Sequence, residues 1–378
     1  MDIMSLLHLP LAVIIGYTVP FLVALTLIVF VHEYGHFKVA RLCGVNIEIF
    51  SIGFGREMWG WTDGHGTRWK IGWLPLGGYV KFAGDANVAS LPDSSSHAGP
   101  AKPGDFHTKP VWQRALVVVA GPLANFILAI AIFSASYAII GQPVSEPRVD
   151  EVVAGSAADK AGLRSGDLIR SINGTAIRTF QDIQEIVMTH GDDPLTVTVV
   201  RGGKELSLVA VPEVSEQPDG FGGKVRIGML GIRNSGSTFV YQKKSLNEAL
   251  ELGIGRTWFI VETTFRYLGK LFLAQESTSQ LGGVISIAKA AGDAAAIGIP
   301  QFIFMIGLLS VSIGLINLFP IPMLDGGHLV YYAIEAVRGK PLGPEAQEWG
   351  FKIGFTVVLA LMLVGTWNDL VRLVAPVQ

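Results

Sequence analysis

The chain has 378 residues, of which 50% are hydrophobic and 16% charged, and its mean hydropathy is +0.45. This composition is too apolar for one soluble domain and indicates a polytopic membrane protein that carries a soluble insert. The net charge of −2 gives no sign of a nucleic-acid-binding surface. Cys43 is the only cysteine, which excludes an internal disulfide and a thiolate zinc cluster.

The first apolar segment, residues 18–41, contains the pattern H-E-x-x-H at residues 32–36. On a helix, His32 and His36 lie one turn apart on one face, where both imidazoles can bind one Zn²⁺. The adjacent Glu33 can then take a proton from water. A charged group near the middle of a membrane span costs roughly 2.5–3.5 kcal/mol on insertion scales. Three ionisable side chains in one apolar helix are therefore better explained by a metal site than by the solvent-exposed face of an ordinary helix.

A catalytic zinc needs a third protein ligand and one open position. Asp325 is a candidate, because it follows Pro320 and Pro322 at the end of the third apolar segment, residues 299–319. The prolines must open the backbone there, and open backbone at membrane depth persists only inside protein or around water. His328 is the rival ligand, and the spacing alone does not choose between them. Asp325 could also simply cap the next helix.

The second apolar segment and the loop before it contain further features. Residues 69–84 are rich in β-formers around Leu76-Gly77-Gly78, which predicts a hairpin with its turn there. The tryptophans of this loop fit an interfacial belt, or else a small soluble subdomain. Residues 85–106 resemble a disordered linker in composition. Asn125 in the second span either joins two helices by a hydrogen bond or faces the site.

The insert after the second span contains the run AGSAADKAGLRSGDLIRSINGTAI at residues 154–177. Small residues are followed in order by A-G-L, G-D-x-I and I-N-G. The run resembles a PDZ domain of the bacterial, circularly permuted kind. The fold class predicted for the chain is thus a polytopic α-helical membrane protein of about four transmembrane helices, with a membrane-associated β-hairpin and an inserted PDZ-like α+β domain.

Lysine and arginine are concentrated in the loops at 37–114 and 338–352, which the positive-inside rule places in the cytoplasm. Both termini and the PDZ-like insert are then expected outside, with residues 85–108 inside. The expected segments are a lead with the first transmembrane helix (1–41), a cytoplasmic loop (42–110), a second helix (111–141), the PDZ-like domain (142–235), an amphipathic membrane-surface region (236–297), a third helix with the proline segment (298–328), and a cytoplasmic loop with a fourth helix (329–378).

Four features together carry a family resemblance: HEYGH at 32–36, GPLANF at 121–126, the PDZ-like insert, and NLFPIPMLDGGH at 317–328. In this order they resemble the site-2 protease family of intramembrane zinc metalloproteases, and within it the regulator of sigma-E protease (RseP) type. The likeness covers nearly the whole chain. Two departures concern substrate selection: the chain has one PDZ-like domain where related members often have two, and Ser312 stands where some have Asn.

The resemblance implies one Zn²⁺ per chain, held by His32, His36 and Asp325, with Glu33 as the general base. It implies that the hairpin at 71–84 dips into the membrane and adds substrate as a strand, through Gly77, Gly78 and Tyr79. Asn317 would hold the substrate backbone. In the PDZ-like domain we expect the peptide groove at Leu163 and Ile169.

The implied substrates are single-span membrane proteins of the anti-sigma-factor type, already cut by an upstream site-1-type protease, together with signal-peptide remnants. The implied location is the bacterial inner membrane, with the PDZ-like domain periplasmic and the active site toward the cytoplasm. Two other functions are open on the residues alone: a metal transporter, and a catalytically silent membrane scaffold that works through its PDZ-like domain. A transporter would need neither Glu33 nor the insert, and the intact H-E-x-x-H disfavours a silent scaffold.

Overall fold

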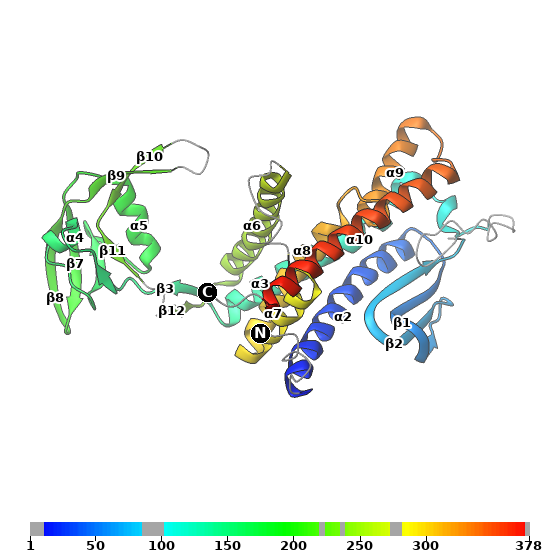
Figure 1. The fold of residues 1–378 in the computed structure, drawn as a ribbon, viewed down its shortest axis with the longest axis horizontal. Helices are drawn as coiled ribbons and strands as arrows, with labels where there is room; N and C mark the ends of the chain where they lie inside the picture. The colour runs from blue at the N-terminus through cyan, green and yellow to red at the C-terminus, as the bar shows by residue number, and fades with distance from the viewer. Residues whose placement is uncertain (1–10, 85–101, 219–223, 235–238, 273–281, 375–378) are drawn as a thin grey trace. The chain divides into compact units, whose positions relative to one another are not determined.

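The structure is a computed structural model that describes residues 11–84, 102–218, 224–234, 239–272 and 282–374 (Figure 1). The chain forms two compact units: a membrane unit, residues 1–136 and 246–378, and an inserted unit, residues 137–245. Residues 85–101 of the expected linker lie outside the described residues.

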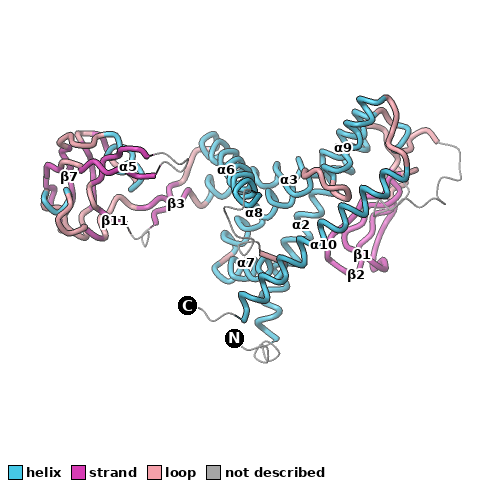
Figure 2. The backbone as a smooth tube through the Cα atoms, turned by 45° about the horizontal axis from the view of Figure 1, so that its top comes forward, coloured by secondary structure: helices cyan, strands magenta, loops and turns pink. Residues whose placement is uncertain are grey.

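The membrane unit consists of long helices and one pair of strands (Figures 1 and 2). Its elements are α2 (Leu11–Leu42), β1 (Ile47–Thr62), β2 (Arg68–Phe82), the 3₁₀ turn η1 (Phe106–Thr108), α3 (Val111–Ile139), α6 (Leu246–Phe272), α7 (Val284–Ile297), α8 (Ile299–Asn317), α9 (Asp325–Arg338) and α10 (Pro344–Val374).

Among the described residues, four helices are long and apolar enough to cross a bilayer, which agrees with the predicted number of spans. They cover Val13–Leu42, Val111–Ile139, Ile299–Asn317 and Pro344–Arg372. At a rise of 1.5 Å per residue, even the shortest covers about 29 Å, close to the roughly 30 Å hydrocarbon core of a bilayer. The third span stops at Asn317 because the prolines that follow cannot continue a helix.

The first span packs near the centre of the membrane unit. Ala24 and Ile28 of α2 are fully buried against Ile306 of α8. Further toward the end of α2, Phe37 and Ala40 are buried with Phe50 of β1 and Val117 of α3. The helix that carries the H-E-x-x-H pattern therefore packs against α8, α3 and the strand pair on successive parts of its length.

Strands β1 and β2 are joined by a turn at residues 63–67, and this corrects the predicted hairpin. Residues 49–52 of β1 pair with residues 68–71 on one side and with residues 78–81 on the other. The two halves of the 69–84 segment thus never pair with each other, and Leu76-Gly77-Gly78 is not a hairpin turn. The prediction failed because the β-forming run before residue 63 was not recognised as the partner of both halves.

Trp69 is partly buried against the cluster around Phe37 and Phe50, whereas the other tryptophans of the loop are exposed. Its ring stacks on Phe50, with ring centroids 4.3 Å apart. In contrast, Trp59, Trp61 and Trp73 are exposed, at 60%, 43% and 59%. One tryptophan of the loop thus packs against its neighbours, and the other three are exposed on the surface, as an interfacial belt requires.

The inserted unit is a small α+β body. Its elements are β3 (Gln142–Ser145), β4 (Glu151–Val152), α4 (Ala157–Lys160), β5 (Leu168–Ile172), β6 (Thr175–Ala176), α5 (Phe180–Thr189), β7 (Leu195–Arg201), β8 (Lys204–Ala210), β9 (Glu213–Pro218), β10 (Lys224–Met229), β11 (Ile232–Arg233) and β12 (Phe239–Gln242). The antiparallel four-stranded sheet has the order β6-β5-β7-β8. The first and last strands of the unit, β3 and β12, also pair with each other.

Local sequence explains both helices of this unit. Ser156 caps α4, and Thr179 forms a capping box with Asp182 at the start of α5. The apolar faces of both helices pack on the sheet around Leu195 and Val197, which are fully buried. Of these elements, α4, β5 and β6 lie within the PDZ-like run at residues 154–177.

Candidate metal centre

His32 and His36 lie one turn apart on α2, as the spacing predicts. Both side chains are buried, at 7% and 8% exposure, and their Nε2 atoms lie 3.1 Å apart. Close approach of α3 leaves no room for a side chain on that side, since a Cβ on Gly121 would lie 2.3 Å from His36 Nε2. The reverse contact is equally tight, because a Cβ on Gly35 would lie 2.4 Å from the carbonyl oxygen of Ala120.

Asp325, the first residue of α9, reaches the same point. Its Oδ2 atom lies 3.0 Å from His32 Nε2 and 3.5 Å from His36 Nε2, and forms no hydrogen bond in the described part of the chain. His328 lies one turn further along α9, and its ring packs against Tyr331. The structure thus brings Asp325, and not the rival His328, to the two histidines.

The three ligand atoms fit a zinc ion. Ligands at about 2.0–2.1 Å from a tetrahedral zinc lie about 3.3 Å from one another, close to the separations of 3.0–3.5 Å among these atoms. His32, His36 and Asp325 form a metal-ligand group of three whose atoms all lie within 4.8 Å of one another. Imidazole nitrogen and carboxylate oxygen are ordinary zinc ligands, and a cation would relieve the repulsion between facing nitrogen lone pairs.

The other ring nitrogens are held in a way that frees Nε2 for a metal. Nδ1 of His36 lies 2.8 Å from the carbonyl oxygen of Val117, to which it can only donate. Nδ1 of His32 lies 3.2 Å from the side-chain amide of Asn125. The amide nitrogen of Asn125 faces the ring, and its Oδ1 is buried with no hydrogen-bond partner in the described residues. With the amide turned so that Oδ1 faces the ring, that oxygen gains a partner and His32 donates from Nδ1, as His36 does.

Asn125 combines the two alternatives that the sequence left open. It is fully buried and faces His32, while its backbone carbonyl accepts a hydrogen bond of 2.8 Å from Ser310 of α8. It therefore joins α3 to α8 and contacts the site. The sequence signal was the GPLAN run, in which Gly121 and Asn125 lie one turn apart on the face of α3 that meets α2.

Glu33 lies between the histidines and the edge of the sheet. A Cβ on Gly78 would lie 3.5 Å from Cγ of Glu33 and 3.6 Å from Cγ1 of Val29, so this strand runs along α2. The hydroxyl of Thr26 donates a hydrogen bond of 3.2 Å to the carbonyl oxygen of Pro75. Residues 75–80 of β2 therefore follow the first span from Thr26 to the motif, with residues 78–81 at an edge of the sheet.

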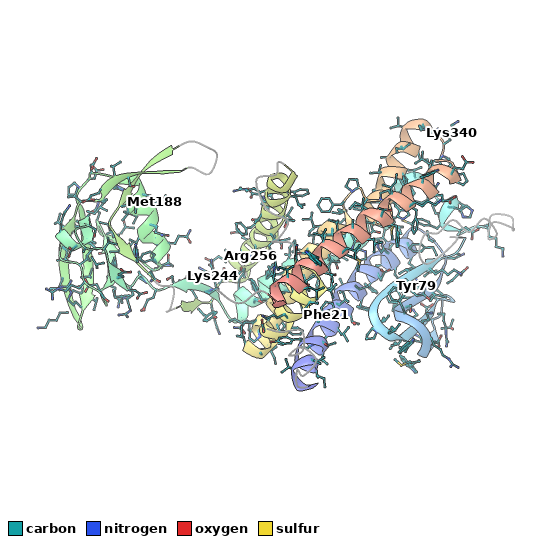
Figure 3. All side chains as sticks on the ribbon, in the orientation of Figure 1. Phe21, Tyr79, Met188, Lys244, Arg256 and Lys340 are labelled. Atoms are coloured by element: carbon teal, nitrogen blue, oxygen red, sulfur yellow. The ribbon has the colours of Figure 1, made fainter. Side chains whose placement is uncertain are left out.

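Gly77 and Tyr79 flank Gly78 at the same edge. Gly77 has φ +141°, and a Cβ there would lie 2.8 Å from the ring of Phe54, so only glycine fits. Tyr79 stacks on Phe54 with centroids 6.0 Å apart, and its position on the strand pair is labelled in Figure 3. Asn317, the last residue of α8, is half-buried at the start of the proline segment.

Asp63 anchors the turn of the strand pair to the end of α2. Its carboxylate accepts hydrogen bonds from Arg41, from the indole of Trp69 at 3.1 Å, and from the backbone N–H groups of His65 and Thr67. Burial alone would raise the pKa of Asp63, but these hydrogen bonds outweigh it and hold the pKa well below its usual range. The charged form of Asp63 therefore stabilises the position of β1 and β2 against the first span.

The inserted unit contains a groove of about 610 Å³ between α5 and β9–β11. Its apolar lining includes Phe180, Ile183, Val187, Met188, Leu230 and Ile232. The expectation that Leu163 and Ile169 line the groove is wrong, because both belong to the core, at 3% and 0% exposure. The A-G-L and G-D-x-I signatures mark residues that build the fold, not residues that contact a ligand.

Comparisons with known proteins agree with the site. The model of peptidase family M50 matches residues 20–361, a range that includes all three grouped residues. The chain belongs to peptidase family M50, the site-2 protease family. It is 47% identical over 365 residues to a "putative zinc metalloprotease" of Agrobacterium fabrum, covering 95% of this chain and 97% of that one. It is 42% identical over 381 residues to metalloprotease MmpA of Caulobacter vibrioides, covering 94% and 95%.

Solved PDZ domains resemble part of the chain. The HtrA3 PDZ domain bound to a phage-derived ligand is 34% identical, covers 21% of this chain and 75% of its own, and gives a TM-score of 0.18. The family membership and the metalloprotease names of the relatives identify this M50 member as a zinc metalloprotease embedded in a membrane.

Proposed function

We propose that this M50 member is an intramembrane endopeptidase that cuts the transmembrane segments of single-span proteins that have already been trimmed outside the membrane. The observation that carries the proposal is the meeting of His32, His36 and Asp325 from two helices of the membrane unit, with Glu33 beside an edge strand of the sheet. We further propose that the chain binds one Zn²⁺ through these three residues and resides in a bacterial inner membrane.

Glu33 is the proposed general base. A zinc ion held by the three ligands supplies a Lewis acid that polarises a peptide carbonyl and lowers the pKa of water. Glu33, the residue after His32, stands beside this position without belonging to the ligand group. Its carboxylate takes the proton from the attacking water and then gives it to the leaving amine. His36 and His32 contribute by keeping Nε2 free, through the partners of their Nδ1 atoms.

Strand addition is the proposed route by which a helical substrate presents its backbone. A transmembrane helix engages its carbonyls in internal hydrogen bonds, so the segment to be cut must unwind. The edge at residues 78–81 offers backbone groups next to Glu33 that can replace the lost bonds. Asn317, where the third span ends, is the proposed second contact for the substrate backbone.

The inserted unit is the proposed gate for substrate size. With both termini outside, this unit faces the periplasm and the metal centre lies toward the cytoplasmic side. The groove beside α5 could bind the new C-terminus left by an upstream protease, or the bulk of the unit could exclude untrimmed substrates. Apolar side chains such as Ile183 and Ile232 would accept an apolar C-terminal side chain, and Gln184 and Arg233 also line the groove. Proposed substrates are anti-sigma-factor-like proteins and signal-peptide remnants.

Two substitutions distinguish the gating routes. Ile232→Ala alters the groove lining, whereas Val209→Ala alters an exposed position on β8 and serves as the matched control. Capture predicts slower cutting of a trimmed substrate by Ile232→Ala only. Exclusion by bulk predicts that both variants cut trimmed substrate normally. A chain lacking the inserted unit that inserts and binds zinc, yet still refuses untrimmed substrate, would contradict both routes.

The function itself is tested with the full chain reconstituted in vesicles. The substrate is a single-span peptide, offered with and without a folded outer domain. We expect cleavage within the membrane segment of the trimmed form, loss of cleavage on zinc chelation, and recovery on zinc addition. Cleavage only outside the membrane segment, or zinc crossing the vesicle membrane without any cleavage, would contradict the proposal.

A further inference from the structure

The segment between α8 and α9, residues 318–324, lies against two glycines of the fourth span. A Cβ on Gly354 would lie 1.6 Å from the carbonyl oxygen of Pro322. A Cβ on Gly350 would lie 3.7 Å from Cβ of Pro322 and 2.0 Å from the hydroxyl of Tyr331 in α9. These glycines are four residues apart and so share one face of α10. Figure 1 shows α10 passing beside α9, which begins at Asp325. We call this face the glycine notch.

The same segment is enclosed from the side of α9. A Cβ on Gly326 would lie 2.3 Å from the carbonyl oxygen of Phe319, and one on Gly327 would lie 2.4 Å from that of Ile321. Between these contacts, Met323 has φ +103°, which residues with a side chain rarely adopt. Such a conformation persists only where the surroundings impose it. The backbone before Asp325 is therefore held on both sides in a conformation that it would not choose alone.

We propose that Gly350 and Gly354 are positioning residues for Asp325. The glycine notch seats Pro322, three residues before the carboxylate that lies 3.0 Å from His32 Nε2 and 3.5 Å from His36 Nε2. A metal ligand must be held within about 0.5 Å of its productive position. A methyl group on residue 354 would force the carbonyl of Pro322 to move by more than that. The inference rests on the proposed metal centre and adds the fourth span to it.

The sequence pattern of the notch has another common use, which the structure disfavours. Gly350 and Gly354 form a G-x-x-x-G pattern in an apolar helix, and such patterns often mediate association of two transmembrane helices. Here the chain's own loop occupies the position against Gly354. A second copy that docked on this face would have to displace the loop that presents Asp325.

Gly354→Ala tests the positioning role by metal affinity rather than by activity. Gly255→Ala is the matched control, because Gly255 also lies in a helix of the membrane unit and a Cβ there meets nothing within 4 Å. Zinc affinity is measured by competition with a chelator on the purified full chain. We expect Gly354→Ala to bind zinc about 10–100-fold more weakly, with a changed absorption spectrum after cobalt substitution. Gly255→Ala should match the unaltered protein in both.

If Gly354→Ala does not accumulate in membranes, the positioning role is tested with a second pair of variants, Gly350→Ala and Tyr331→Phe. The contact at Gly350 is with the end of a side chain, so Gly350→Ala should weaken zinc binding several-fold, and Tyr331→Phe should restore it in the double variant. Tyr331→Phe alone should bind zinc normally. Unchanged zinc affinity in an inserted Gly354→Ala or Gly350→Ala, or no restoration by Tyr331→Phe, would overturn the proposal. Retention of zinc by Asp325→Ala would instead contradict the proposed metal centre itself.

Discussion

Oδ2 of Asp325 lies 3.0 Å from Nε2 of His32, although these residues belong to helices near opposite ends of the chain. The contact joins α2, which carries the H-E-x-x-H pattern, to α9, which begins where the proline segment ends. The metal centre therefore depends on the folding of the whole membrane unit. Neither motif alone supplies the three ligands that a catalytic zinc requires.

Asp325→Ala should abolish stoichiometric zinc binding and cleavage, whereas His328→Ala should retain zinc. The reason is that Asp325 lies with both histidines, and His328 is not in the ligand group. Metal analysis of the two purified variants measures the difference. The reverse pattern would make His328 the third ligand.

Asn125→Ala should weaken zinc binding about 10–100-fold, the usual effect of losing the partner of a ligand histidine. The side-chain amide of Asn125 lies 3.2 Å from Nδ1 of His32 and holds the ring that must present Nε2. Ser136→Ala is the control in the same helix, because its hydroxyl donates to the carbonyl oxygen of Ile132, away from the site. Chelator competition gives the affinities, and equal values for both variants would exclude a role for Asn125 at His32.

Acid should loosen the strand pair through Asp63. The folded pKa of this carboxyl is depressed below its unfolded value of about 3.9, so the stabilisation is complete above about pH 4 and is lost as pH falls further. Asp63→Asn should therefore raise amide hydrogen exchange in β1 and β2 about tenfold at neutral pH. Asp193→Asn, at an exposed position, is the control. Exchange that is equally slow in both variants would show that Asp63 does not anchor the turn.

Single-cysteine labelling tests the proposed orientation. In a Cys43→Ser background, a reagent that cannot cross the membrane should label Glu205→Cys on the inserted unit of intact cells. It should not label Lys340→Cys in the loop before α10, until the membrane is made permeable. Both positions are exposed, so accessibility in the fold does not limit labelling. Labelling of Lys340→Cys in intact cells would reverse the proposed topology.

The sequence predicted those features whose signals lie within one segment. The four spans follow from long apolar runs, and the pair His32 and His36 follows from its helical spacing. The strand pairing was mispredicted, because residues 49–52 take partners on both sides and no local pattern reveals such a pairing. Leu163 and Ile169 were misassigned for a related reason: a fold signature marks core positions as readily as ligand contacts.

Choosing Asp325 over His328 required knowledge of how α9 is placed. Both residues lie on the same short helix, three positions apart, and both are possible zinc ligands. The placement of α9 depends on contacts with α10 that no sequence motif indicates, such as that of Gly354 with Pro322. The family resemblance supplied the choice, and the distances support it independently.

The central claim, that Glu33 is the base of an intramembrane zinc protease, is tested most directly by Glu33→Gln. Zinc content and cleavage of a single-span peptide are measured side by side on the purified variant and the unaltered chain in vesicles. We expect one zinc per chain in both, with cleavage by Glu33→Gln reduced by at least about 10²–10⁴-fold, because only the proton acceptor is lost. Turnover by zinc-loaded Glu33→Gln at the rate of the unaltered protein would contradict the account.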